Sequence, residues 1–242
     1  MTRRRWLADE FSGDRAALTG AHAAHLVRVL RAQVGQEFDI VTGAEVRSGR
    51  VTSIAKERVE FVLGEVVPAP ALPEVTLVLA IFKFDRMEWA IEKCTELGVA
   101  RIVPVVAQRT DEHLGAAAPK RLERWRRIAR EAAEQSRRLA APEIAQAIKL
   151  RDALYAAGDL RILLAETEQG TMLKKALQQK PQAPVTVLAV GPEGGWAKDE
   201  LHLFASAGWI LASLGSTILR AETAAIASVA IALAERDKVS SE

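Results

Sequence analysis

The strongest indication of the fold is VTVLAVGPEGGW, residues 185–196, followed by WILASLGSTILRAETAAIASVAIALAE, residues 209–235. In each stretch, a short apolar run typical of a buried strand leads into a loop rich in glycine and polar residues, and then into a predicted helix. In an open α/β sheet, small molecules bind at the carboxyl ends of such strands. Two neighbouring loops of this kind therefore predict one composite ligand pocket.

The chain from Val75 onward alternates strand and helix patterns. Apolar runs predict buried strands at 75–82, 101–106, 161–166, 185–190 and 209–214. Helices are predicted at 86–97, 120–139, 171–179, 198–207 and 222–236. In the first helix the apolar stripe comprises Met87, Ala90, Ile91 and Cys94, and Gly98 ends the helix. This alternation predicts an α/β domain with a largely parallel sheet and helices on both of its faces.

The N-terminal part of the chain has a different pattern. Val59, Phe61 and Leu63 alternate with polar residues, as in a half-buried strand, and glycines separate several such pieces. This favours a small β-rich barrel or sandwich. The segment 66–74, VVPAPALPE, carries three prolines and is typical of a linker. We therefore expect two domains, residues 1–70 and residues 74–242.

Composition excludes several classes of protein. The 33 basic and 31 acidic residues give a net charge of only +2, so recognition of a polyanion has to come from local clusters. The single cysteine excludes an internal disulfide and a multi-cysteine metal site, and no metal is predicted. No run approaches the roughly 18 apolar residues of a membrane span. Acidic residues follow the basic start MTRRRW, which argues against a signal peptide, so we expect a cytoplasmic protein.

The two glycine-containing loops each admit a plain structural interpretation. GPEGGW lacks the Lys-Ser/Thr pair of a P-loop and the spacing of GxGxxG, and a tight strand-to-helix turn would explain its glycines. In LGSTILRAETAA, residues 214–225, Glu222 and Thr223 fall near a helix start, which favours ligand groups that accept hydrogen bonds. Arg220 beside them could face a ligand or RNA. The alternative is that Glu222 only interacts with the helix dipole.

A basic helix is predicted at PKRLERWRRIAREAAEQSRR, residues 119–138, with eight Lys or Arg and three Glu. Its buried stripe is expected to comprise Leu122, Trp125, Ile128, Ala129 and Ala132. The outward guanidinium groups suit bidentate contact with phosphate, although such a run can also be a simple solvated helix face. Lys83, Arg86 and Arg109 lie just past strand ends and could extend the same positive surface.

Five blocks in order resemble a known family along nearly the whole chain: HLVRVLR (25–31), RMEWAIEKCTELGV (86–99), RWRRIAREAAEQSRR (124–138), GPEGGW (191–196) and LGSTILRAETA (214–224). They resemble the RsmE family of 16S ribosomal RNA methyltransferases, in the SPOUT superfamily of S-adenosyl-L-methionine-dependent enzymes. The resemblance implies an N-terminal PUA-like β-barrel that helps to bind RNA, and a SPOUT domain with a C-terminal trefoil knot. It also implies a homodimer that methylates N3 of a uridine in the decoding region of 16S rRNA, with the 30S subunit as its partner.

The resemblance assigns roles to individual residues. The implied cofactor-binding residues are Leu164, Ala165, Glu166, Gly191, Glu193, Gly194, Gly195, Leu214, Gly215, Ser216, Ile218, Leu219 and Thr223. The implied catalytic residues are Arg220, Glu222 and Arg138, and the RNA-binding candidates are Lys83, Arg86, Arg109, Gln135, Arg28 and Arg31. The chain departs from the family pattern at Thr217, where arginine is expected, and at Phe84, where glycine is usual.

These roles suggest a mechanism for methylation at N3. Uracil N3 carries a proton and becomes a good nucleophile only when that proton leaves. We expect Arg220 or Arg138 to stabilise the negative charge that develops, and Glu222 or water to accept the proton. Two alternatives stay open: a SPOUT methyltransferase acting on tRNA or on a ribose 2′-OH, and a non-catalytic RNA-binding assembly factor. A phosphotransferase is disfavoured because no lysine or magnesium-binding carboxylate pair accompanies the GPEGG loop.

Overall fold

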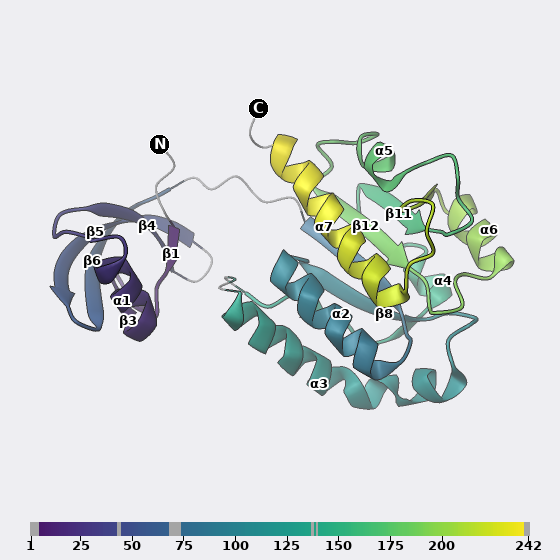
Figure 1. The fold of residues 1–242 in the computed structure, drawn as a ribbon, viewed down its shortest axis with the longest axis horizontal. Coiled ribbons are helices and arrows are strands. Elements are labelled where there is room, and N and C mark those ends of the chain that lie inside the picture. Colours follow the sequence, from purple (N-terminus) through teal and green to yellow (C-terminus); the bar gives the residue numbers. More distant parts are fainter. Residues whose placement is uncertain (1–4, 43–44, 68–73, 137, 139, 240–242) are drawn as a thin grey trace. The chain divides into compact units, whose positions relative to one another are not determined.

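The computed structural model describes residues 5–42, 45–67, 74–136, 138 and 140–239 (Figure 1). The chain forms two compact units, Met1–Ala71 and Leu72–Glu242. Each unit has its own hydrophobic core.

Within its described residues, the N-terminal unit contains a six-stranded sheet and one helix. Its elements are β1 (Arg5–Leu7), β2 (Glu10–Ser12), β3 (Arg15–Thr19), α1 (Gly20–Arg28), β4 (Glu37–Thr42), β5 (Glu45–Ala55) and β6 (Arg58–Val66). The strand order is β1-β4-β5-β6-β3-β2, and all pairs except β1–β4 are antiparallel. Ala8 N donates to Val41 O, and Asp9 N donates to Ala17 O. One continuous segment, 5–12, therefore joins the two edges of the sheet, as in a small barrel.

The alternation read from the sequence of this unit is confirmed. Val59, Phe61 and Leu63 are buried in its core, where the Phe61 ring meets Phe38 edge-on at 6.3 Å between ring centroids. Leu26 of α1 is fully buried in the same core, so the helix covers the sheet.

The C-terminal unit is built on a seven-stranded parallel sheet. Its elements are β7 (Glu74–Ala80), α2 (Phe84–Leu97), β8 (Arg101–Val106), α3 (Glu112–Gln135), β9 (Glu143–Ile144), β10 (Ile148–Lys149), α4 (Leu150–Ala153), β11 (Leu160–Leu164), α5 (Leu173–Leu177), β12 (Val185–Val190), α6 (Lys198–Ser206), β13 (Ile210–Ala212) and α7 (Ala221–Val239). The strand order is β10-β8-β7-β12-β11-β13, with β9 also paired to β8. All of these pairings are parallel, as expected from the sequence.

Helices cover both faces of this sheet, which confirms the predicted layering. Helices α2, α3, α5 and α7 share one core with the sheet, and Figure 1 shows α2 beside α3 and α7. Helices α4 and α6 share a second core on the other face. Within α2 the predicted stripe is buried, and Gly98 ends the helix with a left-handed φ of 117°.

The predicted start of one helix was wrong, and three short elements were not predicted. Helix α3 begins at Glu112 and not at 120, because Asp111 caps it: Oδ1 accepts from His113 N at 2.8 Å and from Leu114 N at 3.3 Å. Pro119 therefore lies inside the helix. The short elements β9, β10 and α4 were missed, since two to four residues carry too little periodicity to be recognised.

The burial of Cys94 makes a testable prediction about its reactivity. The thiol is fully buried on the α2 stripe, and burial raises its pKa to about 12. The stability linked to this group is fully present below the ordinary thiol pKa and is lost as the pH rises towards about 12. We expect a disulfide reagent at pH 8 to leave the folded protein unlabelled and to label it once denaturant is added. Rapid labelling of the folded protein would contradict this environment.

Candidate functional site

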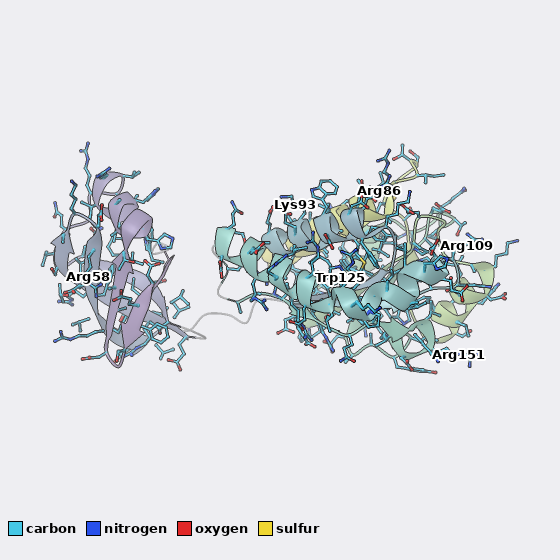
Figure 2. The ribbon with its side chains drawn as sticks, turned by 90° about the horizontal axis from the view of Figure 1, so that it is seen from below. Arg58, Arg86, Lys93, Arg109, Trp125 and Arg151 are labelled. Atoms are coloured by element: carbon cyan, nitrogen blue, oxygen red, sulfur yellow. The ribbon has the colours of Figure 1, made fainter. Side chains whose placement is uncertain are left out.

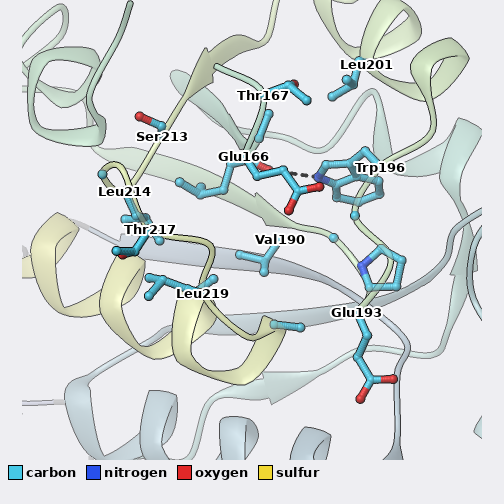
Figure 3. A pocket seen from close by; sticks show the side chains of 18 residues that line it. Glu166, Thr167, Val190, Glu193, Trp196, Leu201, Ser213, Leu214, Thr217 and Leu219 are labelled. Carbon is cyan, nitrogen blue, oxygen red and sulfur yellow. Dashed lines mark hydrogen bonds between the residues drawn. The ribbon is translucent and has the colours of Figure 1, made fainter. Parts of the chain in front are cut away.

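A pocket lies at the carboxyl ends of β11, β12 and β13. These strands are aligned, with Leu163 opposite Ala189 and Leu164 opposite Ala212, so the loops that follow them meet at one edge of the sheet. The cavity has a volume of about 750 Å³ when the solvent in its open mouth is included (Figure 3). The first turns of α7 complete its wall through Ala221 and Ala224.

The pocket brings together most of the residues that the resemblance assigns to a cofactor. Those that line it are Leu164, Ala165, Glu166, Gly191, Glu193, Gly195, Leu214, Gly215 and Leu219. Four others lie outside the lining: Gly194, Ser216, Ile218 and Thr223. All four are exposed to solvent, and Ile218 is 80% exposed.

Sequence reasoning missed a second set of lining residues: Thr167, Val190, Pro192, Trp196, Leu201, Ser213, Thr217, Ala221 and Ala224. Pro192 and Trp196 belong to the quoted GPEGGW motif, so that motif could have supplied them. Ala221 and Ala224 line the cavity from the start of α7. Thr217 lies in the lining although it departs from the family pattern.

Trp196 connects two of the pocket loops. Its indole Nε1 donates a hydrogen bond to Leu164 O at 3.1 Å, and both residues line the pocket (Figure 3). A Cβ at Gly191 would lie 3.2 Å from the same indole, so glycine lets the ring pack against the backbone after β12. The ring also meets Phe204 of α6 at 5.1 Å. Trp196 therefore fixes the end of β11 relative to the end of β12.

A buried carboxylate lies next to the pocket. Glu222 in the first turn of α7 is only 4% exposed, and the helix start stabilises its negative charge. Its Oε1 lies 3.8 Å from Arg86 Nε, and Arg86 Nη1 donates to Glu193 Oε1 at 3.0 Å. The other oxygen, Oε2, is buried and has no hydrogen-bond partner among the described residues. It is thus a free acceptor beside the loops that form the pocket.

The structure places two of the RNA-binding candidates on the pocket loop. Arg86 bridges the carboxylates of Glu193 and Glu222, and Arg109 Nη1 donates to Gly194 O at 2.5 Å (Figure 2). Both guanidinium groups therefore hold the protein's own GPEGGW loop. Lys83, by contrast, is exposed immediately before α2.

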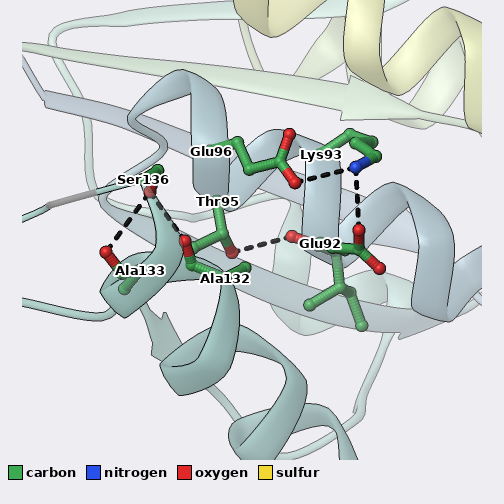
Figure 4. A network of polar contacts seen from close by, with 8 residues as sticks. Glu92, Lys93, Thr95, Glu96, Ala132, Ala133 and Ser136 are labelled. Atoms are coloured by element: carbon green, nitrogen blue, oxygen red, sulfur yellow. Dashed lines mark hydrogen bonds and ion pairs between the residues drawn. The ribbon is translucent and has the colours of Figure 1, made fainter.

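Arg138 lies at the other end of α2 from this site. It is half-buried, its Nη1 donates to Thr95 O at 2.9 Å, and burial lowers its pKa. Thr95 is in the last turn of α2, which has 14 residues and is about 21 Å long, whereas Arg86 is in the first turn. Figure 4 shows the neighbouring ends of α2 and α3, where Ser136 Oγ donates to Ala132 O. A single chain therefore does not bring Arg138 together with Arg220 and Glu222, and Gln135 is likewise at this end of α3.

Much of the positive charge on α3 is neutralised within the chain. Arg124 makes a bidentate pair with Glu88 of α2 at 2.7 and 2.8 Å, and Arg126 Nη1 contacts Glu123 at 2.8 Å. Lys120 and Arg130 are exposed and have no ion pair among the described residues of the chain. Fewer cations of α3 are therefore available to contact a polyanion than the composition of the helix suggests.

Phe84, where the family usually has glycine, has a packing role. Its ring lies edge-on to Trp125 of α3 at 5.9 Å, and the guanidinium of Arg121 lies 4.7 Å from the ring centroid. This aromatic contact joins the start of α2 to α3.

The remaining predicted residues are exposed. Arg220 immediately precedes α7, its carbonyl accepts from Ala224 N, and its guanidinium has no partner among the described residues. Arg28 and Arg31 lie on the N-terminal unit, where Arg31 has a left-handed φ of 51°. The described residues contain no group of three or more His, Cys, Asp or Glu suited to a metal ion. Within the same residues, no helix is long and apolar enough to cross a membrane.

Two family models match the chain. An RNA methyltransferase domain matches residues 70–233, and an RNA methyltransferase PUA domain matches residues 18–64. Among solved structures, the chain is similar to a ribosomal RNA small subunit methyltransferase E from Neisseria gonorrhoeae bound to S-adenosyl methionine. The TM-score is 0.62 at 29% identity, over 94% of this chain and 95% of the other. A putative methyltransferase from Legionella pneumophila with bound SAM gives 0.62 at 27% identity, over 97% and 98%.

Curated relatives give the same result. The chain is 35% identical over 218 residues to ribosomal RNA small subunit methyltransferase E of Synechocystis sp., covering 88% of this chain and 71% of the relative. It is 33% identical over 218 residues to the protein of that name from Rickettsia conorii, covering 88% and 87%. With the matched domains and the pocket at the strand ends, this shows that the chain belongs to the ribosomal RNA small subunit methyltransferase E family.

Proposed function

We propose that this protein is an S-adenosyl-L-methionine-dependent methyltransferase that methylates N3 of a uridine in the decoding region of 16S rRNA. The observation that carries the proposal is the pocket formed by the loops after β11, β12 and β13, in a chain whose solved relatives bind S-adenosylmethionine. The assembled 30S subunit is the proposed substrate, and the cytoplasm is the proposed location.

The pocket residues suit this cofactor. Gly191 and Gly195 keep side chains away from two points of the wall, because a Cβ there would meet Trp196 and Glu166. Leu164, Val190 and Leu219 offer apolar contacts, and the carboxylates of Glu166 and Glu193 favour a cationic ligand. When bound, S-adenosyl-L-methionine supplies an electrophilic methyl group attached to a positively charged sulfur. The residues proposed to hold it are those of the predicted set that line the pocket.

Two residues are proposed to act on the uracil. Glu222 Oε2 is a buried acceptor without a partner in the described chain, so it is suited to accept the proton from N3. Arg220 stands two positions earlier, and its guanidinium has no partner among the residues that the structure describes, so it would stabilise the charge that develops on N3 and the flanking carbonyl oxygens. Arg138 lies too far along α2 to share this role within one chain.

Calorimetry and methylation assays test the proposal. We expect S-adenosyl-L-methionine to bind to the protein, and mass spectrometry of digested rRNA to find 3-methyluridine after incubation with 30S subunits from a strain lacking the gene. Parallel reactions with free 16S rRNA test the choice of substrate, and greater turnover on free RNA would overturn it. Absence of cofactor binding would favour a non-catalytic RNA-binding factor. Methylation of a ribose 2′-OH or of tRNA would show that the protein is a SPOUT methyltransferase with another substrate.

The proposed RNA contacts are the exposed polar residues outside the pocket wall: Lys83, Gln135, Arg28 and Arg31, together with Lys120 and Arg130 of α3. They would position the RNA through its phosphates. Arg86 and Arg109 are proposed to act indirectly, since both already hold the GPEGGW loop.

Substitution of Gly195 by alanine is expected to weaken cofactor binding about tenfold, since a left-handed non-glycine residue costs about 1–2 kcal/mol. Gly195 has a φ of 69°, and a Cβ there would lie 2.9 Å from Glu166 Oε1 inside the pocket. Calorimetry with S-adenosyl-L-methionine measures the change.

Gly208 provides the matched control for this substitution. Its φ of 80° is also left-handed, but it follows α6, away from the pocket, and the nearest atom to a Cβ would be Arg161 Nη2 at 3.6 Å. Gly208→Ala should lower the melting temperature and leave the cofactor Kd unchanged. Equal effects of the two variants on Kd would show that global stability, and not the pocket, is responsible.

We further propose that the protein is a homodimer that associates through α2 and α7. These helices pack on each other, and α2 exposes Trp89 and Leu97, which are 47% and 40% accessible in the single chain. Ile226 and Ala230 of α7 are only partly buried. Sedimentation should give the mass of a dimer, and Trp89→Glu should shift it towards the monomer. A monomeric wild-type protein would exclude this arrangement.

A trefoil knot in the C-terminal part is also proposed. Thr171 O accepts from Ser213 N, and Leu173 N donates to Ser213 O, so the segment after β13 lies against the segment after β11. From the sheet edge at β13 the chain then returns to the middle, where α7 packs on β7 and β12. This return path beside an earlier loop supports threading. A crystal structure with an unknotted backbone trace would disprove it.

A further inference from the structure

Glu200 is a buried carboxylate with two backbone partners from different parts of the chain. It lies in the first turn of α6 and is 4% exposed. Its Oε2 accepts from Ala197 N at 2.8 Å, the usual capping contact at a helix start. Its Oε1 accepts from Gln108 N at 2.7 Å, and Gln108 is 92 positions away in the loop between β8 and α3. One side chain therefore joins the β8–α3 loop to the loop that carries GPEGGW.

A second contact joins the same two loops. Arg109, the neighbour of Gln108, donates to Gly194 O, and its side-chain carbons lie against Gly194. The β8–α3 loop is itself held in place, because Thr110 Oγ1 accepts from Ala107 N and donates to Ile81 O, both at 3.1 Å. The GPEGGW loop thus contacts a loop that has its own hydrogen bonds to residues that follow β7 and β8.

We propose that Glu200 and Arg109 are positioning residues that hold the GPEGGW loop in the shape required for the cofactor. This rests on the proposed function of the pocket. Trp196 and Leu201, on either side of the Ala197–Glu200 turn, both line the pocket, so movement of the turn would move the wall. Gly195, whose left-handed backbone contributes to the same wall, lies directly between the Arg109 contact and Trp196.

The charge of Glu200 is part of this role. A carboxylate accepts from both N–H groups, whereas the amide of glutamine has one oxygen and would turn a donor towards one of them. If the carboxylate only capped α6, its loss would lower stability and leave the pocket unchanged. If it positions the loop, its loss also weakens ligand binding.

The experiment compares Glu200→Gln with Asp199→Asn in the full-length protein. Asp199 lies in the same helical turn and is exposed, so its substitution removes the same charge without breaking either contact. We expect Glu200→Gln to weaken S-adenosyl-L-methionine binding about tenfold, the scale of one charged hydrogen bond, and to raise the KM for the cofactor more than it lowers kcat. Hydrogen exchange should increase in segments 105–110 and 191–199. Asp199→Asn should match the wild type in each measurement.

If Glu200→Gln fails to fold, Arg109→Met provides a second test of the positioning role. Arg109 is exposed, so this variant should fold and should show the same local increase in exchange at 191–199 and weaker cofactor binding. Cofactor affinity within twofold of the wild type in the folded variants, with only a lower melting temperature, would overturn the positioning role. A wild-type protein that binds no cofactor would overturn the proposed function instead, and the exchange data would still report whether the two loops are joined.

Discussion

Glu222→Gln is expected to lower kcat for rRNA methylation by a factor of about 10² to 10³, the usual contribution of a general base. The substitution keeps the size of the side chain but removes its ability to accept a proton. Glu222 Oε2 is buried and has no hydrogen-bond partner among the described residues, so it is available to accept the proton. Single-turnover assays with 30S subunits and saturating cofactor measure the chemical step directly.

The pH dependence distinguishes a general base from a structural carboxylate. If Glu222 removes the N3 proton, the defect of Glu222→Gln should shrink as the pH rises, because hydroxide increasingly removes that proton instead. Glu193→Gln is the informative comparison, since it also removes a partner of Arg86 but leaves Glu222 in place. If both variants show a kcat defect of equal size that does not change with pH, the role of Glu222 is to hold Arg86 in place and not to accept the proton.

Arg220→Ala is expected to lower kcat by about 10²-fold or more, in the range seen when one donor to a developing oxyanion is removed. Arg220 is exposed and its guanidinium has no partner in the described chain, so its loss should cost little stability. Arg220→Lys should restore part of the rate, because a lysine keeps the charge without the planar pair of donors.

RNA affinity separates catalysis from binding for this residue. Filter-binding assays should give Arg220→Ala an affinity for the 30S subunit close to that of the wild type. Arg151→Ala serves as the control for loss of an exposed positive charge, since Arg151 lies on α4 at the other face of the sheet (Figure 2). Full turnover by Arg220→Ala would rule out the electrostatic role, and a loss entirely in RNA affinity would make Arg220 a docking residue.

The elements with strong local patterns could be predicted from the sequence. The stripe of α2 from Met87 to Cys94 and its glycine end follow from helical periodicity, and the parallel sheet follows from alternating strand and helix patterns. The pocket could be predicted because the loops after β12 and β13 carry glycines at strand ends. Helix α3 shows where such reasoning fails, since its start was expected at 120, whereas Asp111 provides the actual cap and the helix begins at Glu112.

The partners of the arginines could not be predicted. Arg86 contacts Glu193, which is 107 positions away, and Arg109 contacts Gly194, 85 positions away. Such pairs depend on the order of strands in the sheet, which no local pattern encodes. The family pattern suggested that Arg138 lies near the catalytic residues. A motif gives the identity of a residue, but it does not give the atoms that its side chain contacts. Within one chain, Arg138 contacts Thr95 O at the far end of α2.

The ion pairs that the arginines of α3 form have a consequence for how ionic strength acts on this protein. Binding to a polyanion releases condensed counterions only in proportion to the cations that newly contact phosphate. Arg124 and Arg126 already have carboxylate partners, whereas Lys120 and Arg130 have none among the described residues. If α3 contacts RNA as proposed, the salt sensitivity that it imparts depends on those of its described cations that have no carboxylate partner. The total number of Lys and Arg residues in α3 overstates that sensitivity.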